Sequence, residues 1–480
     1  MPRWESDALG GMDIPDDALW GIQTQRALGN FGSPGNRATA NLRLMHAIVM
    51  VKKAAALTHE KLHPDRAEVY GAIAAACDQA LSGDHDCQFV VPALQGGAGT
   101  SANMNANEVL ANLALGILGL PRGDYRGVHP LDDVNRGQST NDVYPTALRI
   151  AAVGLLRELA DEAASLQEAL QLRENELSDI RKLGRTELMD AVPVTLGEEF
   201  GAWAQAISRD RWRLYKIEER LRQVNIGGAA VGLSPLSERR YRFGVLERLR
   251  EITGIGLAAS EYPMDVTQNN DVFVEVSGLL KAMAANLSKI CGDIRLMASG
   301  PNGGLGEIRL KPMQLGSTAM PGKVNPVIPE FVSVIAMKVM ANDLSVTMAA
   351  SRGEFELNAF LPLIAESLLE SLELSRDAAK ALREKCVETL SPDPGRCLAH
   401  LDASLAFAAS YAPKLGYDRV ASILREHGGD PQESLAALEK ACGEKDQGNA
   451  EGQGHASEDG REAGEGANDD PKDPKDPKEP

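Results

Sequence analysis

The longest runs of this sequence place apolar residues three and four positions apart, and this spacing restricts the chain to helical folds. One stripe comprises Leu148, Ala152, Leu155, Leu159, Ala163, Leu166 and Leu170. A second comprises Phe200, Trp203, Ile207, Leu214, Ile217 and Leu221, and a third Val276, Leu280, Met283, Leu287, Ile290, Ile294 and Met297. Residues spaced in this way lie on one face of an α-helix. Further helical blocks are expected at 327–349 and 359–386. We therefore predict an all-α fold around a central bundle of long helices.

The remaining chain divides by composition around this bundle. Residues 1–142 mix shorter helices with loops and are expected to form an N-terminal helical domain, followed by the central bundle at 143–392. A small C-terminal helical domain is expected at 393–442. From 443 to 480 the sequence is rich in Gly, Glu, Asp, Lys and Pro. Such a segment buries too little apolar surface to offset its ordering entropy, so we predict a disordered acidic tail.

Charge and cysteine content exclude several functional classes. The formal net charge is −18, from 68 acidic and 50 basic residues, and no nucleic-acid partner is expected because phosphate binding needs a basic face. No apolar run reaches the roughly 20 residues of a membrane helix, and the first residues lack a signal-peptide core. The cysteines are Cys77, Cys87, Cys291, Cys386, Cys397 and Cys442. They form no CxxC motif and no pattern with histidine, which favours reduced thiols in a cytoplasm and no metal site.

Four polar segments stand where helices are expected to begin. They are GAGTSANMNANEV (97–109), GQSTNDVYPTALRI (137–150), GRTELMDAVPVTLGEEF (184–200) and GSTAMPGKVNP (316–326). Each offers Ser, Thr or Asn at a helix start, and the simplest interpretation is that these residues are only N-caps. Helix N-termini also offer free N–H groups and a partial positive charge. Several that converge would form a pocket for a small polyanion such as a dicarboxylate, but spacing alone does not show convergence.

The segment GSTAMPGKVNP closely resembles GSSxMPxKxNP, the signature loop of the aspartase/fumarase superfamily. The other three segments resemble the remaining active-site regions of that superfamily. The similarity extends from WESDALGGMDIPDDALWGIQTQRALGNF near the start to LGYDRVASILREH near the end, so it leaves out only the tail. The resemblance implies a three-domain helical fold and a homotetramer whose active sites are each built from three subunits. It also implies elimination of an amine or water from a succinate-type substrate, without a cofactor.

Within the superfamily, GAGTSANMN and STNDVYP are more similar to aspartate ammonia-lyases than to fumarate hydratases, whose loops usually read SGTQxNMN and SSNDVFP. WGIQTQR and HPLDDVN lean toward fumarases or are shared. The resemblance therefore favours reversible anti-elimination of ammonia from L-aspartate to give fumarate. Alternatives are a class II-type fumarate hydratase acting on L-malate, or an ammonia-lyase for another aspartate-like amine. A non-catalytic tetramer that binds partners through its acidic tail is a fourth possibility.

The resemblance also implies a role for each site residue. Ser317 would be the base that removes the β-proton and generates an aci-carboxylate intermediate. Groups that would hold the carboxylate beside the amine-bearing carbon are Lys323, Asn325 and Thr186. Groups that would hold the other carboxylate are Thr100, Ser139 and Thr140, while Asn141 would contact the leaving group. The simpler interpretation of Lys323 is a solvated loop lysine.

Glu187 departs from the superfamily pattern, since fumarases carry His at that position and aspartases carry His or Gln. In the fumarases this His pairs with a glutamate that matches Glu330. Two carboxylates at a site for a dianion repel by about 4 kcal/mol at 4 Å and an effective dielectric of 20. Either one of them is protonated or a substrate cation compensates, and an α-ammonium would supply that cation. We therefore hypothesise that Glu187 favours an amine substrate over a hydroxy acid; drift in a repurposed paralogue is the alternative.

Overall fold

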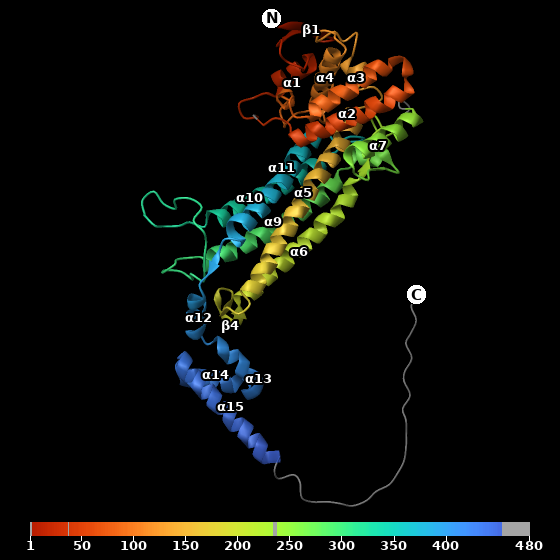
Figure 1. Ribbon diagram of the computed structural model, residues 1–480. Coiled ribbons are helices and arrows are strands. Elements are labelled where there is room, and N and C mark those ends of the chain that lie inside the picture. Colours follow the sequence, from red (N-terminus) through yellow and green to blue (C-terminus); the bar gives the residue numbers. More distant parts are fainter. Residues whose placement is uncertain (1, 37, 234–237, 454–480) are drawn as a thin grey trace, which may run out of the picture. The chain divides into compact units, whose positions relative to one another are not determined.

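Long helices form a bundle at the centre of the protein. The computed structural model describes residues 2–36, 38–233 and 238–453 (Figure 1). The long helices are α5 (Thr140–Glu176), α6 (Leu196–Leu221), α9 (Asp271–Met297), α10 (Val327–Ala350) and α11 (Leu361–Leu382). Helix α5 packs against α6 and α11, and α9 packs against α6, α10 and α11. The three apolar stripes predicted from spacing are buried on α5, α6 and α9, so this part of the prediction is confirmed.

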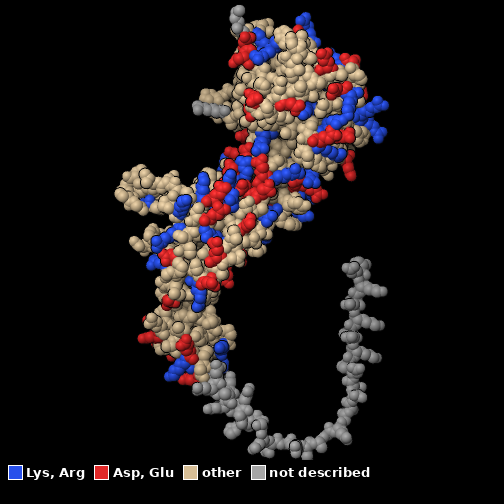
Figure 2. All heavy atoms as spheres, in the orientation of Figure 1, with Lys and Arg blue, Asp and Glu red and all other residues tan. Residues whose placement is uncertain are grey.

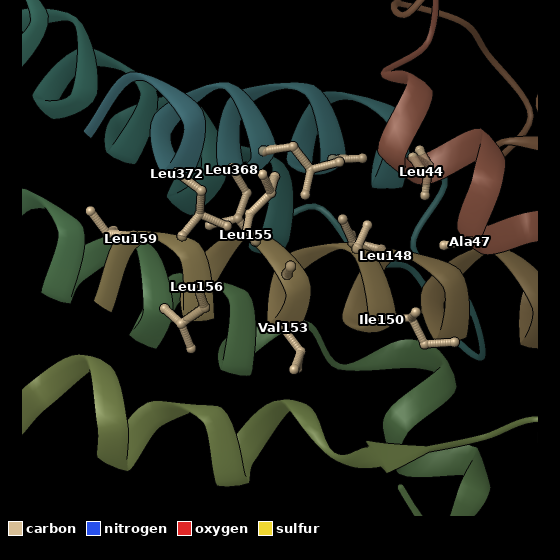
Figure 3. Packing of buried hydrophobic residues seen from close by; sticks show 14 of the residues in the cluster. Leu44, Ala47, Leu148, Ile150, Val153, Leu155, Leu156, Leu159, Leu368 and Leu372 are labelled. Carbon is tan, nitrogen blue, oxygen red and sulfur yellow. The ribbon is translucent and has the colours of Figure 1, made fainter. Parts of the chain in front are cut away.

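Leucine side chains fill the space between α5 and α11. Leu148 and Leu155 of α5 lie on the side that faces Leu368 and Leu372 of α11 (Figure 3), and all four side chains are buried. Burying a leucine side chain contributes about 1.5–3 kcal/mol relative to leaving it exposed. A stripe of this length therefore fixes the bundle and sets where the first turn of α5 lies.

Shorter helices cover the end of the bundle at which α5 begins. They are α1 (Ile22–Phe31), α2 (Leu42–Leu62), α3 (Ala67–Leu81), α4 (Thr100–Ile117), α7 (Arg239–Thr253) and α8 (Pro263–Gln268). Helix α2 packs against α3, α5 and α7, while α4 packs against α1 and α3. A π-helical turn, Pro130–Val134, precedes α5. These contacts hold the starts of α4 and α5 in the same region.

A buried carboxylate anchors α1 to α4. Glu108 of α4 accepts hydrogen bonds from the backbone N–H groups of Gly21, Gln23 and Thr24 at 2.8, 2.8 and 3.0 Å. It also accepts one from the Thr24 hydroxyl at 2.7 Å. The first N–H groups of a helix have no partner within it, so a carboxylate placed there satisfies them. Burial nevertheless raises the pKa of Glu108, and the four hydrogen bonds oppose that rise.

The strands are short and pair in twos. In one antiparallel pair, β1 (Arg3–Asp7) runs beside β2 (Gly10–Ile14) with Arg3 opposite Ile14. The pair of β5 (Gln223–Val224) and β6 (Ala258–Ala259) is parallel. The antiparallel pair of β7 (Ile308–Arg309) and β8 (Ser391–Pro392) lies beyond α9. The described chain is therefore mostly helical, as the sequence predicts.

The described chain forms two compact units, and each is described by itself. The first contains everything named so far. The second contains residues 181–194 and the chain from Cys397 onward. Its elements are β3 (Arg181–Thr186), β4 (Met189–Thr195), α12 (Pro394–Asp402), α13 (Ala412–Leu415), α14 (Tyr417–Glu426) and α15 (Pro431–Gln453), of which β4 and α12 begin or end at the boundary. Buried Leu183 packs with Leu401 and Ala406.

The predicted domain boundaries at 142 and 392 stay a prediction. The two compact units divide the chain at other positions, namely after residues 180, 194 and 396. Helix α15 runs past residue 443, where the tail was expected to begin, and ends at Gln453. The rest of the predicted tail, 454–480, lies outside the described residues.

Helix α10 has one buried and one exposed apolar face. Its inner face is buried in the bundle and includes Val332, Ile335, Ala336, Val339 and Val346. Its outer face exposes Phe331, Val334, Met337, Leu344 and Met348 by 47, 64, 63, 59 and 53%. Within the described residues, α10 is also the one helix whose length and composition would suffice to cross a membrane, although a core helix passes the same test. Large exposed apolar patches usually mark a contact surface.

Candidate active site

The start of α5 is fixed by a reciprocal capping arrangement. Ser139 precedes the helix, and its hydroxyl oxygen accepts a hydrogen bond from the Asn141 N–H at 3.2 Å. The Asp142 carboxylate accepts one from the Ser139 N–H at 2.9 Å. A Ser followed three residues later by an acidic residue is the sequence pattern of such a cap. The cap prediction for Ser139 is confirmed, and the cap fixes where Thr140 and Asn141 lie.

The other oxygen of Asp142 holds a neighbouring segment against this helix start. It accepts hydrogen bonds from the N–H groups of Gly227 and Ala229 at 3.0 and 2.9 Å. Burial raises the pKa of Asp142 to about 6, while hydrogen bonds from backbone N–H groups act in the opposite direction. Asn141 donates from its side chain to the Ala230 carbonyl at 2.8 Å. The side chains of Asn141 and Asp142, both in the first turn of α5, therefore hold the backbone of residues 227–230 against the helix start.

The start of α4 lies against the first turns of α5. Thr100 is the first residue of α4, is exposed, and donates its hydroxyl to the Gly97 carbonyl at 2.8 Å. Gly99, with φ of 92°, precedes it. A Cβ atom on Gly99 would lie 2.3 Å from the ring of Tyr144 in α5, so only glycine permits this approach. The structure thus packs the start of α4 against the first turns of α5, while the predicted site roles of Thr100, Ser139, Thr140 and Asn141 stay a prediction.

A buried polar cluster lies beneath these two helix starts. Lys52 of α2 is fully buried and donates from Nζ to Oδ1 of Asn135 at 2.7 Å. Asn103 and Asn107 of α4 donate from Nδ2 to the same oxygen at 3.1 and 3.2 Å. Asn103 also donates to the Thr140 hydroxyl oxygen at 3.3 Å. Burial lowers the pKa of Lys52 to about 7.

Sequence reasoning missed this cluster. Lys52 stands in MVKKAAA and Asn103 in GTSANMN, and both motifs are visible in the chain. The sequence does not show that both side chains are buried and donate to the same Asn135 oxygen, because this depends on how α2 packs against α4 and α5.

The loop before α10 surrounds the Ser317 hydroxyl with its own backbone. The Ser317 oxygen accepts hydrogen bonds from the N–H groups of Ala319 and Met320 at 3.2 and 2.9 Å. Successive backbone N–H groups that point at one oxygen stabilise negative charge on it. This arrangement suits a hydroxyl that has to carry an alkoxide.

The ends of this loop meet at Gly316. Its carbonyl accepts a hydrogen bond from the Asn325 side chain, and a Cβ atom on Gly316 would lie 1.8 Å from the Lys323 carbonyl oxygen. Gly322, with φ of 84°, occupies the left-handed region that glycine adopts most easily. Lys323 is exposed at the base of the loop. The loop is therefore closed at its base and open at its tip.

This loop stands clear of the start of α5 in the same chain. Helix α10 begins away from α2 and α4, and the loop projects to one side (Figure 1). The projection is almost free of charge (Figure 2), since residues 312–322 contain no Lys, Arg, Asp or Glu. Glu330, in the first turn of α10, is half-exposed and pairs with Arg295 at 3.7 Å. One chain therefore does not bring Ser317, Lys323 and Asn325 together with Thr140.

Thr186 and Glu187 lie at the tip of the β3–β4 hairpin in the second unit. Thr186 ends β3, and Glu187 and Leu188 form the connecting turn with φ of 53° and 66°. Two successive positive φ values define a tight hairpin turn that usually contains Asn or Gly. Such values cost about 1–3 kcal/mol for other residues and cluster at functional sites. Glu187, Leu188 and Met189 are all exposed. The predicted site role of Thr186 and Glu187 stays a prediction.

Within the parts of the chain that the structure describes, no three His, Cys, Asp or Glu side chains are placed to hold a metal ion. The predicted site residues themselves offer hydroxyls, amides, the Glu187 and Glu330 carboxylates and the Lys323 side chain.

Comparison with known proteins finds a consistent set of relatives. The sequence profile of a family described as lyase matches residues 10–341. An aspartate ammonia-lyase of Corynebacterium glutamicum is 44% identical over 449 residues, covering 92% of this chain and 85% of that protein. An aspartate ammonia-lyase of Helicobacter pylori is 41% identical over 424 residues, covering 88% of this chain and 91% of that protein.

Solved structures show the same fold. The cobalt-bound fumarate lyase:delta crystallin of Brucella melitensis matches with a TM-score of 0.87 and 44% identity, covering 93% of this chain and 99% of that one. A class II fumarase of Schistosoma mansoni matches with a TM-score of 0.88 and 30% identity, covering 93% and 97%.

Proposed function

This chain belongs to the aspartase/fumarase superfamily of lyases, and we propose that it is an aspartate ammonia-lyase, which converts L-aspartate reversibly to fumarate and ammonia. The observation that carries the proposal is the pair of N–H groups, from Ala319 and Met320, that donate to the Ser317 oxygen. A serine hydroxyl becomes a base only where its alkoxide is stabilised, and here the loop itself supplies that stabilisation. Contacts of this kind also occur in ordinary serine turns, so their place in the loop that resembles the superfamily signature is what connects them with catalysis.

The reaction follows from this arrangement. The Ser317 alkoxide takes the proton from the β-carbon, and the electron pair moves into the adjacent carboxylate to form a doubly charged aci-carboxylate. Donors from Thr100, Ser139 and Thr140 stabilise that intermediate; preorganised donors of this kind contribute about 3–4 kcal/mol each. The pair then returns, the carbon–nitrogen bond breaks, and ammonia leaves. No redox change occurs, so no redox cofactor takes part.

The remaining predicted residues bind the other end of the substrate. Lys323 and Asn325, together with Thr186, hold the carboxylate beside the amine, and Asn141 contacts the leaving group. Glu187 adds a carboxylate near that group, and the substrate ammonium offsets its charge. Glu330 is the supporting carboxylate. A hydroxy acid offers no such cation, and this difference favours aspartate over malate.

We propose that the active protein is a homotetramer whose active sites are shared between subunits. Two observations support this. The first is the exposed apolar face of α10, which includes Phe331, Val334 and Met337. The second is the separation, within one chain, of the Ser317 loop from Thr140 (Figure 1). A site built from several copies explains why each chain carries incomplete parts of it. A cytoplasmic location is also proposed, because the six cysteines form no CxxC motif and four of them are buried.

The first test offers the purified protein L-aspartate and L-malate in parallel and follows fumarate by its ultraviolet absorbance. We expect fumarate from L-aspartate and none from L-malate. Fumarate from malate would establish the second candidate function, a fumarate hydratase, which the likeness to the Schistosoma mansoni fumarase favours. No product from either would point to another aspartate-like amine or to a non-catalytic protein.

Glu187→Gln tests the charge argument within the same assay. If the Glu187 carboxylate pairs with the substrate ammonium, the variant loses preference for aspartate, measured as the ratio of kcat/KM for aspartate and malate. An unchanged ratio would contradict the argument without affecting the proposed reaction.

Mixed oligomers test the sharing of sites. Ser317→Ala and Thr140→Val chains are each expected to be nearly inactive alone. When the two are unfolded together and refolded, some sites receive an intact Ser317 from one chain and an intact Thr140 from another, so activity returns. Light scattering should show about four times the chain mass of 51.3 kDa. A mixture that stays as inactive as its components would contradict shared sites.

A further inference from the structure

The polar cluster under the α5 start connects the buried Lys52 side chain to a hydroxyl of the proposed site. The connection runs from Lys52 Nζ to Asn135 Oδ1 at 2.7 Å, and from there to Asn103 Nδ2 at 3.1 Å. The same Asn103 nitrogen reaches the Thr140 oxygen at 3.3 Å. Lys52 is fully buried, Asn103 is 2% exposed and Thr140 is 8% exposed. Thr140, at one end of this connection, thus lies at the edge of the proposed site, whereas Lys52, at the other end, is shielded from water.

The orientation of Asn135 fixes the direction of every hydrogen bond along this connection. Its Nδ2 donates to the Gln138 carbonyl at 3.2 Å, so its carbonyl oxygen faces Lys52 and accepts from it. Side chains that meet this oxygen must in turn present a donor, so Asn103 turns its amide nitrogen toward Asn135. That nitrogen carries two hydrogens, and the second points at Thr140. The Thr140 oxygen is therefore an acceptor within the protein.

A hydroxyl that accepts from the protein keeps its own hydrogen for another partner. We propose that Asn103, held by Lys52 through Asn135, is a positioning residue that sets the Thr140 hydroxyl to donate to a substrate carboxylate. This inference rests on the proposed function, because it concerns the same dicarboxylate site. Asn103 does not touch the substrate and acts only through Thr140.

An unpaired oxygen on Asn103 supports a functional origin for this arrangement. The side-chain oxygen of Asn103 is buried and has no hydrogen-bond partner. Burying an unpaired polar atom destabilises a fold, and an apolar residue at this position would avoid this. At Asn103 both amide hydrogens are used, one on Asn135 and one on Thr140. The arrangement thus supplies a hydrogen-bond donor to the Thr140 hydroxyl oxygen.

The test compares Asn103→Ala with Asn107→Ala. The two residues lie on the same helix, are equally buried, and donate to the same Asn135 oxygen, but only the amide of Asn103 donates to Thr140. We expect both variants to lower the melting temperature by similar amounts. Only Asn103→Ala should lower kcat/KM for L-aspartate, by about 10- to 100-fold, which is the range for a hydrogen bond to a charged group.

A double-mutant cycle shows whether Asn103 acts through Thr140. In a Thr140→Val background, Asn103→Ala should cause little further loss, because the hydroxyl that it orients is gone. The same loss in both backgrounds, or equal losses for Asn103→Ala and Asn107→Ala, would overturn the proposal.

Succinate binding separates this inference from the proposed reaction. Succinate has both carboxylates but no leaving group, so calorimetry reports binding whether or not the protein eliminates ammonia. Asn103→Ala should weaken succinate binding about as much as Thr140→Val does, and Asn107→Ala should not. If the wild-type protein makes no fumarate but shows this pattern, the proposed function fails and the inference stands. If the wild type binds no succinate, the inference fails, and the proposed function is decided by the fumarate assay alone.

Discussion

The start of α5 and the loop that carries Ser317 are built in opposite ways. Thr140 and Asp142 lie over a buried network and accept hydrogen bonds from segments far away in the chain, while Asp142 in turn holds Ser139. Ser317 lies in an exposed loop whose stabilising contacts come from the loop itself and from Asn325 at its base. The first region is preorganised by the whole fold, whereas the second is preorganised by contacts within the loop itself.

This difference matches the two tasks of the proposed reaction. Holding a carboxylate and its aci form requires donors that do not rearrange as charge develops. Delivering a base requires a group that withdraws to admit the substrate and then returns, which exposed loops do. Damage to the loop should therefore affect rate without affecting stability, and damage under α5 should affect both.

The largest effect is expected at the loop. Ser317→Ala removes the base, and we expect kcat for L-aspartate to fall by about 10³- to 10⁴-fold, the upper range for a positioned acid or base. The melting temperature should not change, because the hydroxyl bonds only to its own loop. Thr318→Ala is the matched control, since Thr318 is the exposed neighbouring hydroxyl. Equal losses in the two variants would show that the loop matters but that Ser317 is not its base.

A smaller effect is expected from forcing the loop open at its base. In Gly316→Ala the added Cβ would lie 1.8 Å from the Lys323 carbonyl, and this backbone atom has to move. Because a misplacement of about 1 Å costs about 100-fold in rate, we expect kcat to fall by that factor with an unchanged melting temperature.

Gly303→Ala controls for the loss of a loop glycine, because a Cβ there meets nothing within 4 Å. A fall in the melting temperature of Gly316→Ala, with normal kcat, would mean that the loop base is part of the rigid fold. The contrast between the two regions would then be wrong.

The two regions also differ in how far the sequence predicts them. Apolar spacing located the long helices, because that pattern depends only on the geometry of a single helix. The Ser139 cap was equally visible, since its partner Asp142 lies three residues away. The loop before α10 was recognised by its resemblance, and its internal contacts span only a few residues.

What the sequence did not predict depends on segments that are far apart. Lys52, Asn103 and the neighbouring Asn135 and Thr140 come from three separate stretches, and no local pattern shows that they meet. From the sequence, residues 184–200 were predicted only as a polar segment before a helix, because the turn that joins β3 to β4 lacks Asn and Gly. Resemblance identified Glu187 as unusual but did not place it in a strained turn.

The smallest effect concerns the buried ammonium and depends on pH. Burial lowers the pKa of Lys52 to about 7, whereas an unfolded chain keeps the ordinary lysine value of 10.5. Between these values the unfolded chain binds one more proton than the folded one, so the contribution of Lys52 to stability increases as pH rises. Lys52→Met removes this contribution.

Urea titrations at about pH 7.5 and about pH 9 measure the free energy of unfolding of the wild type and of Lys52→Met. The difference, wild type minus variant, should grow with pH by up to about 1.4 kcal/mol per unit. Lys53→Met is the matched control for a lost positive charge on α2, because Lys53 pairs with Asp78 toward the surface. A difference that stays constant or shrinks with pH would mean that Lys52 is not desolvated. The contrast between a buried network under α5 and an exposed loop would then be wrong.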